Sequence, residues 1–169
     1  METTNATISE KELIVQLLLT AWHKHIQQFN QFIAPLSAEE IGQDIAPGRN
    51  SGRYLLGHLT AVTDGMIALF GLGARLYPEL DKLFLSNPDK SGFDYPSVET
   101  LKEQWQAVHE ALNKGMAAMT ADDWLGRHTA VSEEDFSKEP HRNKLNVLIS
   151  RTNHQEYHFG QIKLLRTNE

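Results

Sequence analysis

Residues 153–161 read Asn-His-Gln-Glu-Tyr-His-Phe-Gly-Gln and lie in the last stretch with helical periodicity, about Lys144 to Arg166. His154 and His158 are four residues apart. On a helix this spacing places them about 40° apart around the axis and roughly 6 Å apart along it. Two imidazoles at this spacing can bind one divalent cation. Because the chain has 8 histidines, such a pair also arises often by chance, so the spacing alone predicts a metal site only weakly.

Three residues around the pair add to the prediction. Gly160 costs about 1 kcal/mol in a helix interior relative to Ala, which predicts that another helix or a ligand approaches closely there. Gln161 lies about 20° from His154 around the axis, a position suited to contact with a metal ligand or a substrate, although a surface amide is the simpler interpretation. Arg151, one turn before His154, is equally suited to an anionic substrate group and to a solvated ion pair.

His58 is the third candidate ligand. It lies in a second predicted helix, about Ser51 to Phe70. Its neighbours on the helix surface are almost all apolar, and a buried imidazole needs partners for its nitrogens. Metal ligation is one solution, and a hydrogen bond to a buried group is the simpler one.

Two further helices complete the pattern. The first begins at Ser9, which forms a capping box with Glu12, and ends before Pro35. The third begins at Ser97 and runs to about Met119. The connections at 71–96 and 127–143 are long, and the acidic run at 133–135 is predicted to be a solvated loop. The chain is therefore predicted to be one all-α domain, residues 1–169, folded as a four-helix bundle.

Apolar residues recur in rows on the first helix. Leu13 and Leu17, like Ile14 and Leu18, are four residues apart. An apolar outer face would indicate a dimer, but burial of these rows in the core explains them equally well.

Composition excludes several classes of function. The chain has no cysteine, which removes disulfides, thiolate metal sites and a cysteine nucleophile. The net charge is −6 without a basic tract, so neither nucleic acid nor an anionic membrane is expected as a partner. No signal peptide or apolar run long enough for a membrane span is found, and a cytoplasmic location is expected.

The sequence resembles the DinB/YfiT-like superfamily of small bacterial four-helix bundles. The resemblance rests on Tyr-Leu-Leu-Gly-His-Leu at 54–59 and on the His-x-x-x-His-x-Gly-Gln pattern at 154–161. It implies up-down-down-up topology, frequent homodimers, and a divalent metal held by three residues: His58, His154 and His158. Characterised members include bacillithiol S-transferases and mycothiol-dependent maleylpyruvate isomerases, while others have no known activity.

The expected function is that of a metal-dependent enzyme which transfers a low-molecular-weight thiol to a small electrophile. Zn²⁺ or Ni²⁺ is the expected ion, with Fe²⁺ or Mn²⁺ as alternatives. A hydrolase fits less well, because Gln155 replaces the general base of the His-Glu-x-x-His motif and Glu156 points away from His154. Asp64 is about 120° from His58 around its helix. A non-catalytic metal- or ligand-binding bundle used in stress response is the third possibility.

Overall fold

The computed structural model describes residues 8–166, in which the regular elements are helices and the only β contacts are two isolated bridges. The elements in chain order are α1 (Glu10–Ile33), α2 (Ala38–Gly42), α3 (Gly52–Leu69), α4 (Leu80–Phe84), α5 (Val98–Ala117), α6 (Ala121–Leu125), α7 (Glu133–Lys138), α8 (Lys144–Ile162) and the 3-10 helix η1 (Lys163–Arg166). The prediction of an all-α bundle is confirmed.

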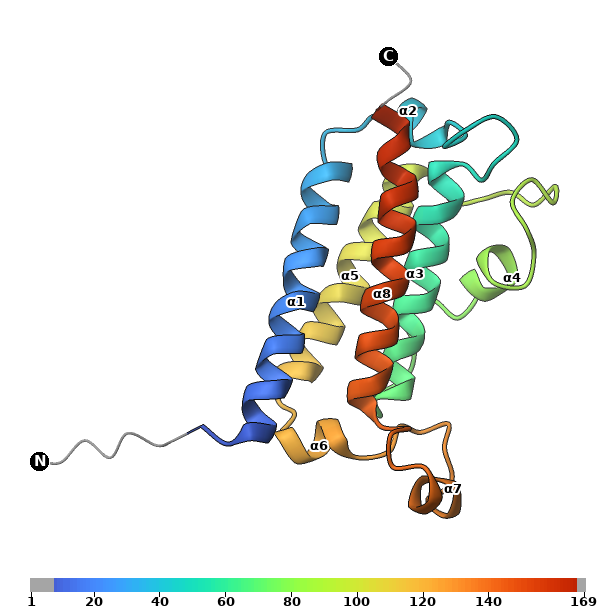
Figure 1. The fold of residues 1–169 in the computed structure, drawn as a ribbon. Helices are drawn as coiled ribbons and strands as arrows, with labels where there is room; N and C mark the ends of the chain where they lie inside the picture. Colours follow the sequence, from blue (N-terminus) through green and yellow to red (C-terminus); the bar gives the residue numbers. More distant parts are fainter. Residues whose placement is uncertain (1–7, 167–169) are drawn as a thin grey trace, which may run out of the picture.

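The four long helices form the bundle. In Figure 1, α1 and α8 run upward, whereas α3 and α5 run downward. Helix α3 packs against both α5 and α8, and α8 also packs against α1. Because α3 and α8 are antiparallel neighbours, residues early in α3 lie beside residues late in α8. This pairing brings position 58 next to positions 154 and 158.

Helix caps set the starts that the sequence predicts. Ser9 and Glu12 form a reciprocal capping box at the start of α1. The Ser97 side chain accepts a hydrogen bond from the Thr100 amide at the start of α5. Each cap satisfies an amide that has no partner within its own helix.

Large apolar side chains fill the space between the long helices. Trp22, Trp105 and Trp124 are all buried, as expected for core residues. The Phe29 ring of α1 lies 4.7 Å from the Trp105 ring of α5, measured between centroids. The Trp105 indole N–H donates to the Asn30 side chain, so polar and apolar contacts together join α1 to α5.

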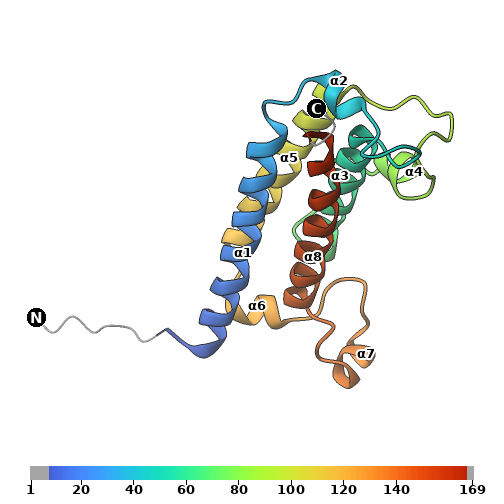
Figure 2. The same cartoon turned by 45° about the horizontal axis from the view of Figure 1, so that its top comes forward.

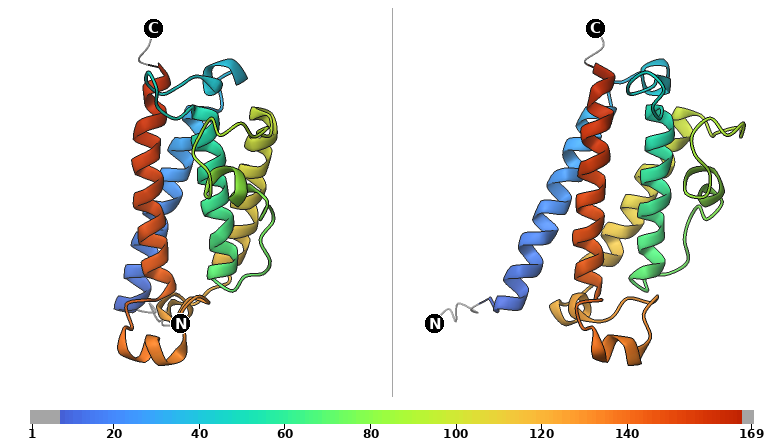
Figure 3. Two further views of the ribbon diagram at one scale, coloured as in Figure 1. Left: turned by 90° about the vertical axis from the view of Figure 1, so that its right-hand side faces the viewer. Right: turned by 45° about the vertical axis from the view of Figure 1, so that its right-hand side comes forward.

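Short elements close the bundle ends and one side. Helix α2 and η1 lie at one end, and α6 and α7 lie at the other (Figures 1 and 2). Helix α4 and the connection around it cover the outer side of α3 (Figure 3). The long connection at 71–96 therefore contains a short helix of its own.

One sequence-based expectation about these elements is wrong. The acidic run Glu133-Glu134-Asp135 is not a loop but the first turn of α7, where negative charge suits the helix dipole. The Ser132 side chain caps this helix by accepting from the Asp135 amide.

The apolar rows of α1 divide between the two explanations that the sequence left open. Leu18 packs against the core, whereas the Leu13, Ile14 and Leu17 side chains are exposed, and Leu17 retains 62% of its accessible surface. Within residues 8–166, no helix is long and apolar enough to cross a membrane.

Candidate metal centre

Three histidines from two helices meet on the side of the bundle where α3 and α8 pack together. The Nε2 atoms of His58 and His154 are 3.1 Å apart, and so are those of His158 and His154. The ligand atoms of all three lie within 4.8 Å of one another. The structure therefore brings together His58, His154 and His158, the three residues predicted as ligands.

Hydrogen bonds on the far side of two rings fix how those rings face the cluster. His58 Nδ1 lies 2.9 Å from the Phe84 carbonyl oxygen at the end of α4. A carbonyl oxygen only accepts, so His58 carries its proton on Nδ1 and presents the Nε2 lone pair to the cluster. His158 Nδ1 donates in the same way to Gln161 Oε1 at 2.7 Å. Such partners orient metal-binding histidines and select the ligating nitrogen.

This arrangement fits a cation better than a hydrogen-bonded cluster. The Nε2 lone pairs of His58 and His158 both face His154 Nε2, which has at most one proton to share between them. His154 Nδ1 is itself buried without a partner. Nitrogen ligands about 2.0–2.1 Å from a tetrahedral Zn²⁺ lie about 3.3 Å apart, close to the observed separations.

The environment of His154 and His158 favours their neutral forms. The pKa of His154 is lowered to about 4, first by burial and then by the positive charge on its histidine neighbours and on Arg151. Burial also lowers the pKa of His158, although the Gln161 hydrogen bond opposes this. A neutral imidazole is the form that binds a metal, so protons compete little at neutral pH.

Gly57 is the glycine that permits a close approach at this site. A Cβ at position 57 would lie 2.4–2.6 Å from atoms of the Phe84 ring. Gly57 thus lets α4 sit against α3, with the Phe84 carbonyl oxygen beside His58 Nδ1. For Gly160 the expected approach of another helix is wrong, because a Cβ there would meet nothing within 4 Å. Gln161 contacts a candidate ligand, as its position suggested.

No Asp or Glu among the described residues joins the three histidines. Glu156 Oε1 lies 2.5 Å from His25 Nδ1 on α1, away from the cluster. Asp64 is completely buried, and its carboxylate accepts from Arg75 and from the Leu76 and Tyr77 amides. Both carboxylates that the sequence analysis considered as bases are therefore engaged elsewhere.

Gln161 also lines a small cavity beside the cluster. This cavity of about 210 Å³ is bounded by Ile45 and by the turn at 48–50. The turn at 48–50 could not be placed near the site from the sequence, because only the pairing of α3 with the end of α8 brings it there.

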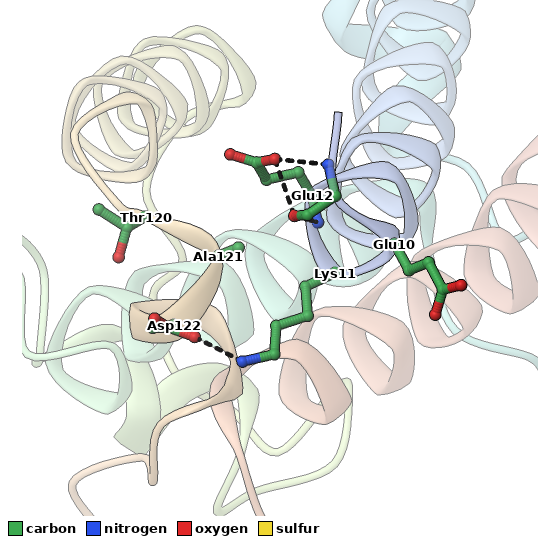
Figure 4. A pocket seen from close by; sticks show the side chains of 7 residues that line it. Glu10, Lys11, Glu12, Thr120, Ala121 and Asp122 are labelled. Atoms are coloured by element: carbon green, nitrogen blue, oxygen red, sulfur yellow. Dashed lines mark hydrogen bonds and ion pairs between the residues drawn. The ribbon is translucent and has the colours of Figure 1, made fainter. Parts of the chain in front are cut away.

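A larger hollow of about 500 Å³ lies at the other end of the bundle, between the start of α1 and α6. Figure 4 shows Glu12 bonded within the first turn of α1 and Lys11 paired with Asp122 across the hollow. Glu12 is held by its hydrogen bonds in the N-terminal cap of α1, and neither histidine nor cysteine lines the hollow. It therefore offers no comparable chemistry.

The remaining histidines do not share a ligand cluster. His23 and His141 are exposed, and the other three are buried or half-buried apart from the three-histidine group. Within residues 8–166, His58, His154 and His158 form the sole group of three or more histidine or acidic side chains close enough to share an ion.

Comparison with known proteins shows which fold and which family this chain has. No curated protein is similar enough to be matched with this chain. The structure resembles the crystal structure of a conserved protein from Enterococcus faecalis, with a TM-score of 0.62 and 17% identity over 90% of this chain and 95% of the other. At this identity the likeness concerns the fold alone. The family model of the DinB superfamily matches residues 21–162. This range includes α3 and α8, the two helices that carry the three histidines. The chain therefore belongs to the DinB superfamily.

Proposed function

We propose that this protein is a divalent-metal-dependent enzyme that activates a low-molecular-weight thiol for transfer to a small electrophile. The observation that carries the proposal is the convergence of three neutral imidazoles in a chain without cysteine. Three neutral ligands leave the full charge of the cation available to act on a fourth ligand. Because the chain supplies no thiol of its own, the nucleophile has to come from a co-substrate.

The protein residues hold and orient the centre. His58, His154 and His158 would bind the ion through Nε2, while Phe84 and Gln161 fix two of the rings. When bound, a divalent cation would supply the positive charge that lowers the pKa of a co-substrate thiol. The overall reaction forms a carbon–sulfur bond. The leaving group departs with its bonding electron pair, and the thiol proton passes to solvent.

The choice of ion follows from the ligand set. Imidazole nitrogens suit Zn²⁺ and Ni²⁺, which are the proposed ions, with Fe²⁺ or Mn²⁺ as alternatives. Because imidazole suits Zn²⁺, Ni²⁺ and Fe²⁺ alike, the availability of the ions helps to decide which one is bound.

Hydrolysis is less well supported. A metal-dependent hydrolase needs a general base within about 3 Å of the attacking water, directly or through one further water. Glu156 and Asp64 are both engaged elsewhere. A non-catalytic metal-binding bundle has the same ligands, and activity alone separates it from the enzyme.

The test is thiol consumption by protein loaded with Zn²⁺ or with Ni²⁺. Loaded protein is incubated with a low-molecular-weight thiol and an alkylating electrophile, and the loss of free thiol is followed over time. We expect metal-dependent consumption that His154→Ala abolishes and His141→Ala leaves unchanged, because His141 is exposed and outside the centre. Fully loaded protein that consumes none of the common low-molecular-weight thiols would contradict the enzyme and favour the binding bundle.

A further inference from the structure

Arg151 lies on the same face of α8 as the metal-binding pair. Positions 151, 154, 158 and 161 follow one another at spacings of three and four residues, so they form one stripe along the helix. Gln161 flanks the pair at one end and is bonded to His158. Arg151 flanks the pair at the other end, about 4.5 Å before His154 along the axis.

The Arg151 guanidinium has no bonding partner among the described residues. Its side chain is half-buried, and its Nε is shielded from solvent without a hydrogen bond. Other half-buried arginines in this chain are paired. Arg75 binds Asp64 and Asp81, and Arg53 donates to the backbone carbonyls of residues 95 and 96. Shielding the Nε–H of a charged side chain from water without a hydrogen bond is costly, so a partner from outside the chain explains Arg151 better than packing does.

The charge of Arg151 acts on the metal centre. It contributes to the lowered pKa of His154, whereas no carboxylate contributes to the pKa shift of either residue. Arg151 therefore places a positive charge beside the centre, although the whole chain carries −6. A cation that has no partner of its own attracts an anion.

The facing stripe of α3 carries a glycine on the side of His58 that corresponds to Arg151. Gly65 follows His58 by seven residues, which places it about 20° away around the α3 axis. Because α3 and α8 are antiparallel, the α3 residues that follow His58 lie beside the α8 residues that precede His154. A Cβ at Gly65 would meet nothing within 4 Å.

From the position of Arg151 beside the histidines and its lack of a partner, we propose that it binds a carboxylate carried by the thiol co-substrate. The inference rests on the proposed function, because the thiol sulfur is taken to bind at the three-histidine centre. The guanidinium then holds the carboxylate through charge-assisted hydrogen bonds and orients the sulfur towards the centre. The substrate class is a small thiol with an acid group a few atoms from its sulfur.

The experiment compares two thiols that differ by one charge. The full chain is loaded with Co²⁺, and each thiol is titrated while the sulfur-to-cobalt absorption band is recorded. The probes are N-acetylcysteine and its uncharged amide. We expect the acid to bind about tenfold to a hundredfold more tightly than the amide, as is typical of a charge-assisted contact. Arg151→Gln should remove this preference and leave binding of the amide unchanged.

Arg142→Gln is the matched control, because it removes the same charge before α8 and breaks an exposed pair with Glu139. It should keep the preference for the acid. Cobalt content and the melting temperature of Arg151→Gln verify that this variant folds and holds the ion. Equal binding of acid and amide by the wild type, or an unchanged preference in Arg151→Gln, would overturn the inference alone. Failure of both thiols to alter the cobalt spectrum would overturn the proposed function and the inference together.

Discussion

Two glycines on the helices of the metal centre are predicted to respond oppositely to the same substitution. In Gly57→Ala the new methyl group would overlap the buried Phe84 ring, and the Phe84 carbonyl oxygen that orients His58 would have to move. We expect a loss of about 1–3 kcal/mol in the free energy of unfolding, as is usual for overpacking, and a roughly tenfold or greater loss of metal affinity.

Gly160→Ala is the matched control. Its methyl group meets open space in a helix, so we expect a gain of about 0.5–1 kcal/mol and unchanged metal affinity. Urea unfolding and competition with a metal chelator measure both quantities. Equal metal affinity in the two variants would contradict the assigned role of the Phe84 carbonyl.

His109 should make the fold sensitive to acid. Its ring is buried between Trp22 and Trp105, and neither nitrogen has a hydrogen-bond partner. Burial lowers its pKa from 6.5 to about 3, with a smaller effect from the charge of His23. Between pH 6.5 and pH 3 the His109 ring is protonated in the unfolded chain but neutral in the folded protein. The free energy of unfolding is therefore unaffected by His109 above pH 6.5. It decreases as the pH falls from 6.5 towards 3, by about 1.4 kcal/mol per pH unit.

The variant His109→Phe keeps an aromatic ring and removes the titration. Urea unfolding at pH 7 and pH 5 should show the wild type losing about 2 kcal/mol more than the variant. The control His141→Phe changes an exposed histidine and should follow the wild type. Parallel losses in wild type and His109→Phe would show that burial does not hold this ring neutral.

At the residue scale, the spacing of residues along a helix predicted the three candidate metal ligands better than it predicted the groups that orient their rings. His154 and His158 follow from one helical turn, and His58 follows from its place on an apolar helix face. The Phe84 carbonyl could not be predicted, because a backbone contact with a short helix leaves no residue-type signal. The cost of Gly160 in a helix suggested that another helix lies close to it, whereas Gly57 is the glycine of the two that another helix approaches.

At the scale of elements, a buried carboxylate ties the connection after α3 to that helix. Asp64 accepts from the Leu76 and Tyr77 amides and from Arg75, which also binds Asp81. Asp64→Ala would leave two amides without an acceptor, so we expect a loss of roughly 2–4 kcal/mol. Asp81→Ala removes the more exposed carboxylate and should cost about 1 kcal/mol or less.

Urea unfolding gives the two losses, and hydrogen exchange at the Leu76 and Tyr77 amides reports the connection directly. Exchange should accelerate in Asp64→Ala and stay slow in Asp81→Ala. The reverse order would contradict the assignment of Asp64 as the main anchor.

Helices were predictable where caps and apolar periodicity agreed. Ser9 and Ser97 each precede an observed helix, and Ser9 forms the capping box with Glu12 that the sequence predicted. Helix α7 was missed because none of its residues is buried, so it lacks an apolar stripe. The Ser132 cap and the acidic first turn were the available signals.

At the scale of the molecule, the exposed apolar residues of α1 bear on assembly. Leu13, Ile14 and Leu17 are exposed neighbours on one face of this helix. Since the core does not explain them, we propose that this face joins two copies in the homodimer that the family resemblance implies. Light scattering should give twice 19.1 kDa for the wild type and 19.1 kDa for the double variant Ile14→Glu/Leu17→Glu.

Leu85→Glu is the control for this prediction, because it introduces the same charge at an exposed apolar residue after α4. It should remain dimeric. A monomeric wild type, or a double variant that still dimerises, would contradict the proposed interface.

The central claim is that His58, His154 and His158 together bind one divalent ion. The most direct test is elemental analysis of the purified chain before and after incubation with Zn²⁺, Ni²⁺, Fe²⁺ or Mn²⁺. The account predicts about one ion per chain in the wild type and in His141→Ala, and loss of the ion in His58→Ala and His154→Ala. An ion-free wild type that takes up none of these metals, or equal metal content in all four proteins, would contradict it.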